Sequence, residues 1–129
     1  MTELAKTSGG NNYAGLQRKL HSFAQALDAA SEALTGIHQR MKTNASLASE
    51  TAQQLDEAHG DAKYVELTSN VSVLLGGAAV QARRTQTAAN ETASASREAA
   101  TAHKQKYGRL DEIRRSRTTK TPKPGFFGE

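Results

Sequence analysis

The chain has 129 residues, a formal net charge of +4 and 36% hydrophobic residues, which suits one domain. Cysteine is absent, so the composition excludes a disulfide framework, a thiolate zinc site and a cysteine nucleophile. Tryptophan is also absent, there are two prolines, and alanine is abundant. This composition is typical of long helices rather than of a globule with a thick core.

The chain begins with a stretch that predicts a flexible leader over residues 1–11. It holds no apolar core of the length that a signal peptide needs. The longest apolar run, residues 71–80, is about half of a membrane span. We therefore expect a cytoplasmic protein with no integral membrane segment, and export without a signal peptide stays open.

A heptad pattern then predicts one long helix over about residues 12–58, with Asn12 as its N-cap. Apolar residues spaced three and four apart form a single stripe that must face a partner. Asn44 lies in this stripe, where a polar residue could fix the register of an assembly. The stripe consists of Tyr13, Leu16, Leu20, Phe23, Leu27, Ala30, Leu34, Ile37, Met41, Asn44, Ala48, Thr51, Leu55 and Ala58.

Residues 59–61 predict a tight turn. Gly60 fits the left-handed position after a helix end, and Asp61 fits the N-cap of the next helix. With so short a connection, two long helices can only fold back antiparallel.

The second helix is predicted over about residues 62–116, and its stripe is dominated by small residues in the middle. Large side chains then face small ones across the hairpin, as close packing requires. The stripe consists of Tyr64, Thr68, Val71, Leu75, Ala78, Ala82, Thr85, Ala89, Thr92, Ser96, Ala99, His103, Lys106, Leu110 and Ile113. The expected pairs are Leu55 with Thr68, Ala48 with Leu75, Met41 with Ala82, Leu34 with Ala89, and Phe23 with Ala99 or Ala100.

The predicted fold is thus an all-α, long antiparallel two-helix hairpin that resembles a coiled coil. Two helices bury little, and the small residues of the second leave Leu27, Leu34 and Ile37 partly covered. We therefore expect self-association into a homo-oligomer, or association with another helical protein. Gly76 and Gly77 interrupt the second helix; they mark a tolerated weak point, a kink, or a close-packing site for another helix backbone.

No motif in the chain points to catalysis or to a cofactor. The four histidines lack metal-binding spacing, and although the hairpin brings His21 near His103, no carboxylate cluster accompanies them. Gly76-Gly77 lacks the strand and the lysine of a phosphate-binding loop. We expect a protein that is not an enzyme and that binds no metal or cofactor.

The charge is concentrated at the C-terminal end. Residues 104–129 hold eight of the seventeen Lys and Arg residues but three of the thirteen Asp and Glu residues. This pattern indicates either a solvated helix end followed by a basic flexible tail, residues 117–129, or a contact surface for protein, membrane or DNA. The basic residues are Lys104, Lys106, Arg109, Arg114, Arg115, Arg117, Lys120 and Lys123.

Tyr107 and Asp111 are spaced four apart near the end of the second helix, on one face. This spacing is similar to the export motif of WXG100-type substrates of type VII secretion, which are helical hairpins of about this size. The resemblance implies signal-less export. The turn, Ala58-His59-Gly60, lacks the tryptophan of that family.

A second resemblance covers most of residues 12–127. It rests on the run Tyr64–Ala79, on His103, Tyr107 and Leu110, on Arg114–Arg117 and on Thr121–Phe127. These segments resemble small actinobacterial proteins of plasmids and integrative elements that are described as conjugal transfer proteins. The resemblance implies an accessory part in plasmid movement, without the motor activity.

The last residues have the form of a short docking peptide. Pro122 and Pro124 favour a stiff, extended backbone, and Phe126 and Phe127 could anchor it in a partner. A chain end whose aromatic residues have no partner is the alternative.

Overall fold

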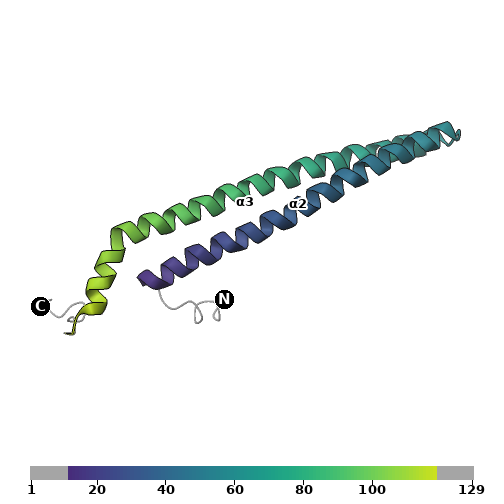
Figure 1. Cartoon of the computed structure of the whole chain (residues 1–129). Helices are drawn as coiled ribbons and strands as arrows, with labels where there is room; N and C mark the ends of the chain where they lie inside the picture. The colour runs from purple at the N-terminus through teal and green to yellow at the C-terminus, as the bar shows by residue number, and fades with distance from the viewer. Residues whose placement is uncertain (1–11, 119–129) are drawn as a thin grey trace, which may run out of the picture.

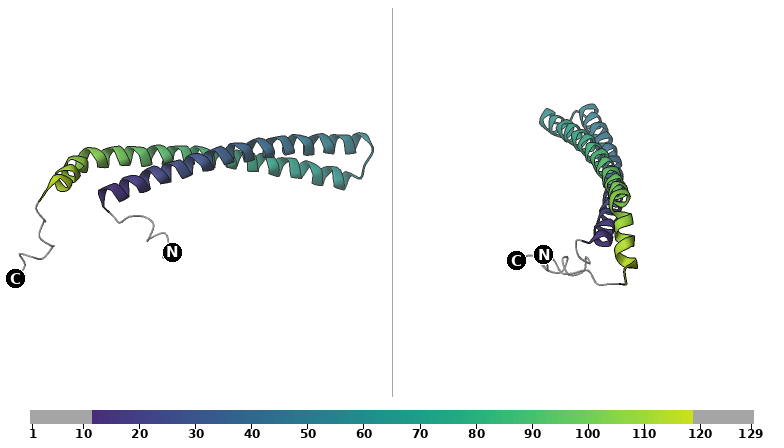
Figure 2. Two further views of the ribbon diagram at one scale, coloured as in Figure 1. Left: turned by 60° about the horizontal axis from the view of Figure 1, so that its bottom comes forward. Right: turned by 90° about the vertical axis from the view of Figure 1, so that its left-hand side faces the viewer.

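The computed structural model describes residues 12–118, and these form two helices. Helix α2 spans Tyr13–Glu57 and helix α3 spans Ala62–Ser116. They lie antiparallel and wind gently around one another (Figures 1 and 2). The predicted all-α antiparallel hairpin is confirmed, with helix bounds within one residue of those expected.

Both predicted N-caps are confirmed. The Asn12 side chain accepts a hydrogen bond of 2.7 Å from the Gly15 N–H, and Asp61 accepts one of 2.9 Å from the Lys63 N–H. These side chains satisfy N–H groups that the start of a helix leaves unpaired. The sequence therefore determines where each helix begins.

The turn has the expected length, but the prediction of its left-handed residue was wrong. His59, not Gly60, has the positive φ, at 55°. The Gly60 N–H donates to Leu55 O at 2.7 Å and the His59 N–H donates to Asp56 O at 3.0 Å, which is the Schellman arrangement. Gly60 serves close approach instead, because a Cβ there would lie 2.8 Å from Leu55 O.

The two helices meet along one seam of buried and half-buried residues, spaced alternately four and three apart. Ala24 and Ala93 are almost fully buried, whereas no large side chain in residues 12–118 is. Alanine in this seam lets the helices approach closely. On α2 the seam is Tyr13, Gln17, Leu20, Ala24, Leu27, Ser31, Leu34, His38, Met41, Ala45, Ala48, Ala52 and Leu55. On α3 it is Val65, Thr68, Ser72, Leu75, Ala79, Ala82, Gln86, Ala89, Ala93, Ser96, Ala100 and His103.

The predicted stripes were therefore half right. As far as His103, alternate predicted residues lie in the seam and the others are exposed, because the seam continues through the residue one position later. Lys106, Leu110 and Ile113 lie beyond the seam and are exposed. Phe23 is exposed and Ala24 is buried, so Phe23 does not belong to the buried seam as predicted. The wrongly placed residues are Leu16, Phe23, Ala30, Ile37, Asn44, Thr51, Ala58, Tyr64, Val71, Ala78, Thr85, Thr92, Ala99, Lys106, Leu110 and Ile113.

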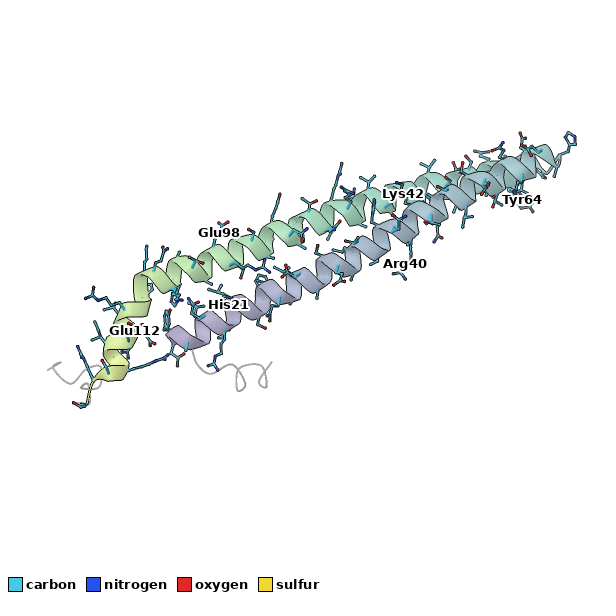
Figure 3. The ribbon with its side chains drawn as sticks, in the orientation of Figure 1. His21, Arg40, Lys42, Tyr64, Glu98 and Glu112 are labelled. Atoms are coloured by element: carbon cyan, nitrogen blue, oxygen red, sulfur yellow. The ribbon has the colours of Figure 1, made fainter. Side chains whose placement is uncertain are left out.

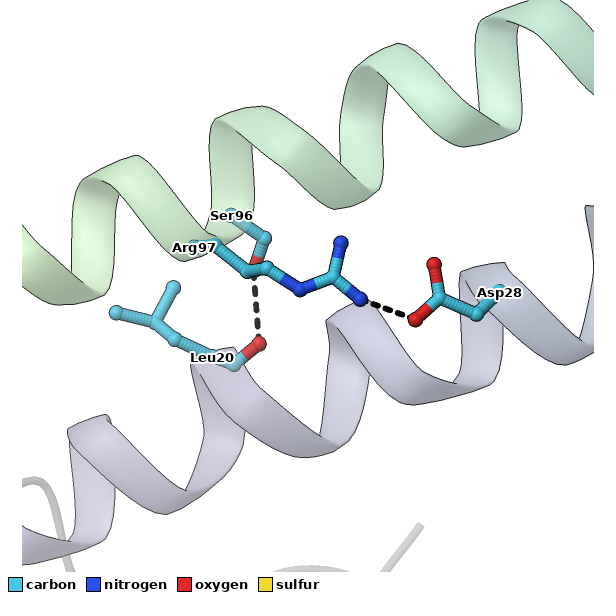
Figure 4. Close-up of polar contacts among 4 residues, drawn as sticks. All are labelled: Leu20, Asp28, Ser96 and Arg97. Carbon is cyan, nitrogen blue, oxygen red and sulfur yellow. Dashed lines mark hydrogen bonds and ion pairs between the residues drawn. The ribbon is translucent and has the colours of Figure 1, made fainter.

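Four seam side chains donate hydrogen bonds to backbone carbonyls of the opposite helix. Because each bond joins a side chain to one carbonyl, the set fixes both the register and the rotation of the helices. One of them, from Ser96 to Leu20 O, is drawn in Figure 4. The bonds are Gln17 Nε2 to Ala100 O, His38 Nδ1 to Ala79 O, Ser72 Oγ to Ala45 O and Ser96 Oγ to Leu20 O, each 2.8 Å.

Helix α3 extends past the start of α2 and bends in its last turns (Figure 1). Gly108 lies in this part, and a Cβ there would come within 3.3 Å of Tyr13 Oη. Helix α3 continues through Gly76 and Gly77, and an added Cβ at either would meet nothing within 4 Å. Within the hairpin the two glycines are therefore not a close-packing site, and contact with a further helix there stays a prediction.

No helix in residues 12–118 combines the length and the apolar character needed to cross a membrane.

Candidate interaction surfaces

One edge of the seam is closed by polar contacts between the helices. Asp28 and Arg97 form an ion pair (Figure 4), and Gln86 Nε2 donates to Thr35 Oγ1 at 2.6 Å. Asp28 and Arg97 each follow a seam residue in sequence. The residues that directly follow Leu27 in α2 and Ser96 in α3, and the residues seven positions before and after them, therefore lie along this edge.

Residues that precede seam positions such as Ala24 and Ser72 consequently share the opposite edge. We call this surface the uncharged flank, and it has two rows on each helix. On α2 the rows are Leu16, Phe23, Ala30, Ile37, Asn44 and Thr51, and Lys19, Ala26, Ala33, Arg40, Leu47 and Gln54. On α3 they are Tyr64, Val71, Ala78, Thr85, Thr92 and Ala99, and Leu67, Leu74, Gln81, Ala88, Ala95 and Ala102.

Charged residues are absent from the α3 part of this surface, while its α2 part holds two. Between Ala62 and His103, α3 carries seven charged residues, and none lies in the flank. On α2, two of nine charged residues do, Lys19 and Arg40. Figure 3 shows Arg40 and Tyr64 on one edge of the rod and Lys42 on the other. The absence of charge from the α3 part is typical of the core of a protein interface.

Large apolar side chains are exposed on the same surface. Phe23 is 52% exposed and Leu74 is 72% exposed. On α3 the residues at 64, 67, 71 and 74 form a continuous stripe with helical spacing, which the sequence reasoning missed because it assigned half of them to the seam. Extended apolar surface of this kind marks an interaction site.

A second candidate lies at the open end, where the last turns of α3 bend beside the start of α2. A cleft of about 390 Å³ lies there, with Tyr13, His103, Tyr107, Asp111 and Arg114 among its lining residues. His103 stacks on Tyr13 with ring centroids 5.1 Å apart, and Tyr107 is tilted against His103 at the same distance. His103 also contacts Gln17. These contacts suit the packing of a helix end and offer no nucleophile with a base.

The residues of the predicted export motif both line this cleft. Tyr107 is in contact with His103, and Asp111 forms an ion pair with Arg115 at 2.8 Å. Arg114 and Arg117 also line it. The basic residues Lys104, Lys106 and Arg109 lie in α3 and are exposed.

His103 stacks on Tyr13, and its Nδ1 contacts Gln17 Nε2. Within residues 12–118, no group of three His, Asp or Glu side chains could hold a metal ion. The predicted docking residues Pro122, Pro124, Phe126 and Phe127, and the basic Lys120 and Lys123, lie outside the described residues.

No protein-family model, curated protein or solved structure matches this chain.

Proposed function

We propose that this chain is a non-enzymatic assembly protein whose hairpin acts by packing its uncharged flank against other helices. One observation carries the proposal: the most buried seam residues are all alanine or serine, while large apolar side chains such as Phe23, Leu67 and Leu74 are exposed outside the seam. A helix pair with so thin a core gains little stability from its own packing. Burial of the flank by a partner supplies what the hairpin lacks.

Sedimentation equilibrium of the full chain, with thermal unfolding at several concentrations, tests this proposal. Binding to the folded state raises the melting temperature by mass action. We expect a mass above that of one chain and a melting temperature that rises with concentration. A protein that stays monomeric, melts at the same temperature at every concentration and binds no other helical protein would contradict the proposal.

The biological setting we propose is an accessory role in conjugal transfer of plasmid DNA. The support is the sequence pattern of residues 64–79, 103–117 and 121–127, which resembles actinobacterial transfer proteins. Disrupting the gene should lower the transfer frequency and leave plasmid maintenance unchanged. An unchanged transfer frequency would refute the role in conjugal transfer and would leave the assembly proposal standing.

Two other settings have specific support. Tyr107 and Asp111 line one cleft of a helical hairpin, which favours a type VII secretion substrate; export that depends on both residues would establish it. The exposed basic residues of α3 favour a nonspecific DNA organiser. Duplex DNA binding that weakens steeply with salt would establish that second setting.

A further inference from the structure

We infer that the uncharged flank is the surface on which two copies of this chain dimerise, antiparallel and about a two-fold axis, to form a four-helix bundle. This inference rests on the proposed function, since it names the partner and the geometry of the same surface. The flank is continuous with the seam: Leu20, Leu27 and Leu34 are half-buried between the two. A second pair of helices would complete their burial, as in four-helix bundles.

The available surface suits a large interface. Eight large apolar side chains of the flank are exposed, among them Phe23, Leu47, Leu67 and Leu74. Obligate homodimers bury about 2,000–5,000 Å² in total. The flank also runs along most of α2 and along α3 as far as Ala102, so an occupant of similar length, such as a second copy, can cover it.

The sizes of the flank residues on α3 are self-complementary. The large residues lie towards the turn, and the small ones lie towards the open end. Two α3 helices that are antiparallel and fully overlapped set a large residue against a small one in four layers, and a two-fold axis repeats each contact. The layers are Tyr64 with Ala102, Leu67 with Ala99, Val71 with Ala95, and Leu74 with Thr92 of the second copy.

The charges at the two ends of the rod decide the orientation. Around the turn, residues 56–66 hold four acidic residues and one lysine, while residues 104–117 hold six basic and two acidic residues. An antiparallel dimer sets the acidic turn of one copy beside the basic end of the other. A parallel dimer would instead bring like charges together at both ends.

Two adjacent residues provide a matched test. Leu74 is 72% exposed and lies in the flank, whereas Val73 is 71% exposed and lies outside it. Neither packs in the seam, so neither substitution should unfold the hairpin. In sedimentation equilibrium, Leu74→Glu should raise the dimer dissociation constant at least ten-fold, and Val73→Glu should change it less than two-fold. Equal effects of the two substitutions would overturn the inference.

Disulfide cross-linking tests the orientation in the full chain, which has no native cysteine. The double variant Val71→Cys/Ala95→Cys should form a covalent dimer on oxidation, whereas either single variant should not. Within one chain these positions are about 36 Å apart, so they cannot bridge internally. An associated protein whose double variant fails to cross-link would refute the antiparallel dimer and leave the assembly proposal standing. A monomeric wild-type protein that also binds no other helical protein would refute both.

Discussion

The turn joins two helices through a residue in an uncommon conformation. His59 has a φ of 55°, a region that costs an L-residue roughly 1–2 kcal/mol and that helix ends usually give to glycine. Gly60 cannot exchange roles with it, because the close approach to Leu55 O leaves no room for a side chain. The strain at His59 is therefore a local cost that the Schellman hydrogen bonds offset.

Replacing His59 with glycine should stabilise the hairpin by about 0.5–1 kcal/mol, since the strain exceeds the added entropy of the unfolded chain. His59→Ala should change stability little, because alanine retains the Cβ that causes the strain. Gly60→Ala should destabilise. Urea unfolding followed by circular dichroism measures all three, and a His59→Gly variant no more stable than His59→Ala would contradict this account of the turn.

At the scale of the helices, the sequence predicted lengths, caps and antiparallel pairing, but not the rotation of each helix. Heptad spacing shows that a helix has a buried stripe but not which residues complete it. The predicted stripe and the observed seam both contain Leu20, Leu27 and Leu34, and they differ in the residues between. Choosing the larger residues selected Phe23 over Ala24. Close antiparallel packing instead buries the smaller residue, and Phe23 remains for the flank. The same ambiguity hid the interaction surface, since the predicted stripe contains half of it.

Polar side chains reinforce the seam where apolar ones would be too large. Ser31 and Ser96 are buried there, and Ser96 donates to a carbonyl of α2. A hydrogen bond of this kind contributes about 0.5–1.5 kcal/mol. Exposed ion pairs such as Asp28 with Arg97 contribute less. The fit of small side chains, rather than charge, holds the two helices together.

Ala93→Leu should therefore destabilise the hairpin by about 1–3 kcal/mol, because Ala93 is 0% exposed and a larger side chain forces the helices apart. Ser94→Leu is the matched control, because Ser94 is the next residue in the chain, is exposed and lies outside both the seam and the flank. Chemical unfolding compares the two variants. A tolerated leucine at 93 would show that the helices are not in close contact at this layer.

The whole molecule combines a rod with an uncharged flank and ends of opposite charge. The flank supplies apolar burial, and on α3 its residues change from large near the turn to small towards the open end. The acidic turn and the basic end supply direction, since like ends repel and unlike ends attract. An assembly of such rods is therefore held by apolar burial and oriented by charge, and raising the salt concentration should weaken the orientation more than the association.

The sequence predicts a separate contact at the C-terminal residues. Burying Phe126 and Phe127 in a partner could contribute about 3–6 kcal/mol before ordering costs, and the stiffness of Pro122 and Pro124 lowers those costs. Deleting residues 118–129 should leave helicity and melting of the hairpin unchanged and abolish capture of a partner from the native host.

Phe126→Ala/Phe127→Ala should reproduce that loss of capture. Lys120→Ala/Lys123→Ala should slow association and preserve capture, because these charges speed the encounter with the partner more than they stabilise the complex. Capture that survives the deletion, or a hairpin that melts earlier without these residues, would show that the tail serves the rod itself and not a partner.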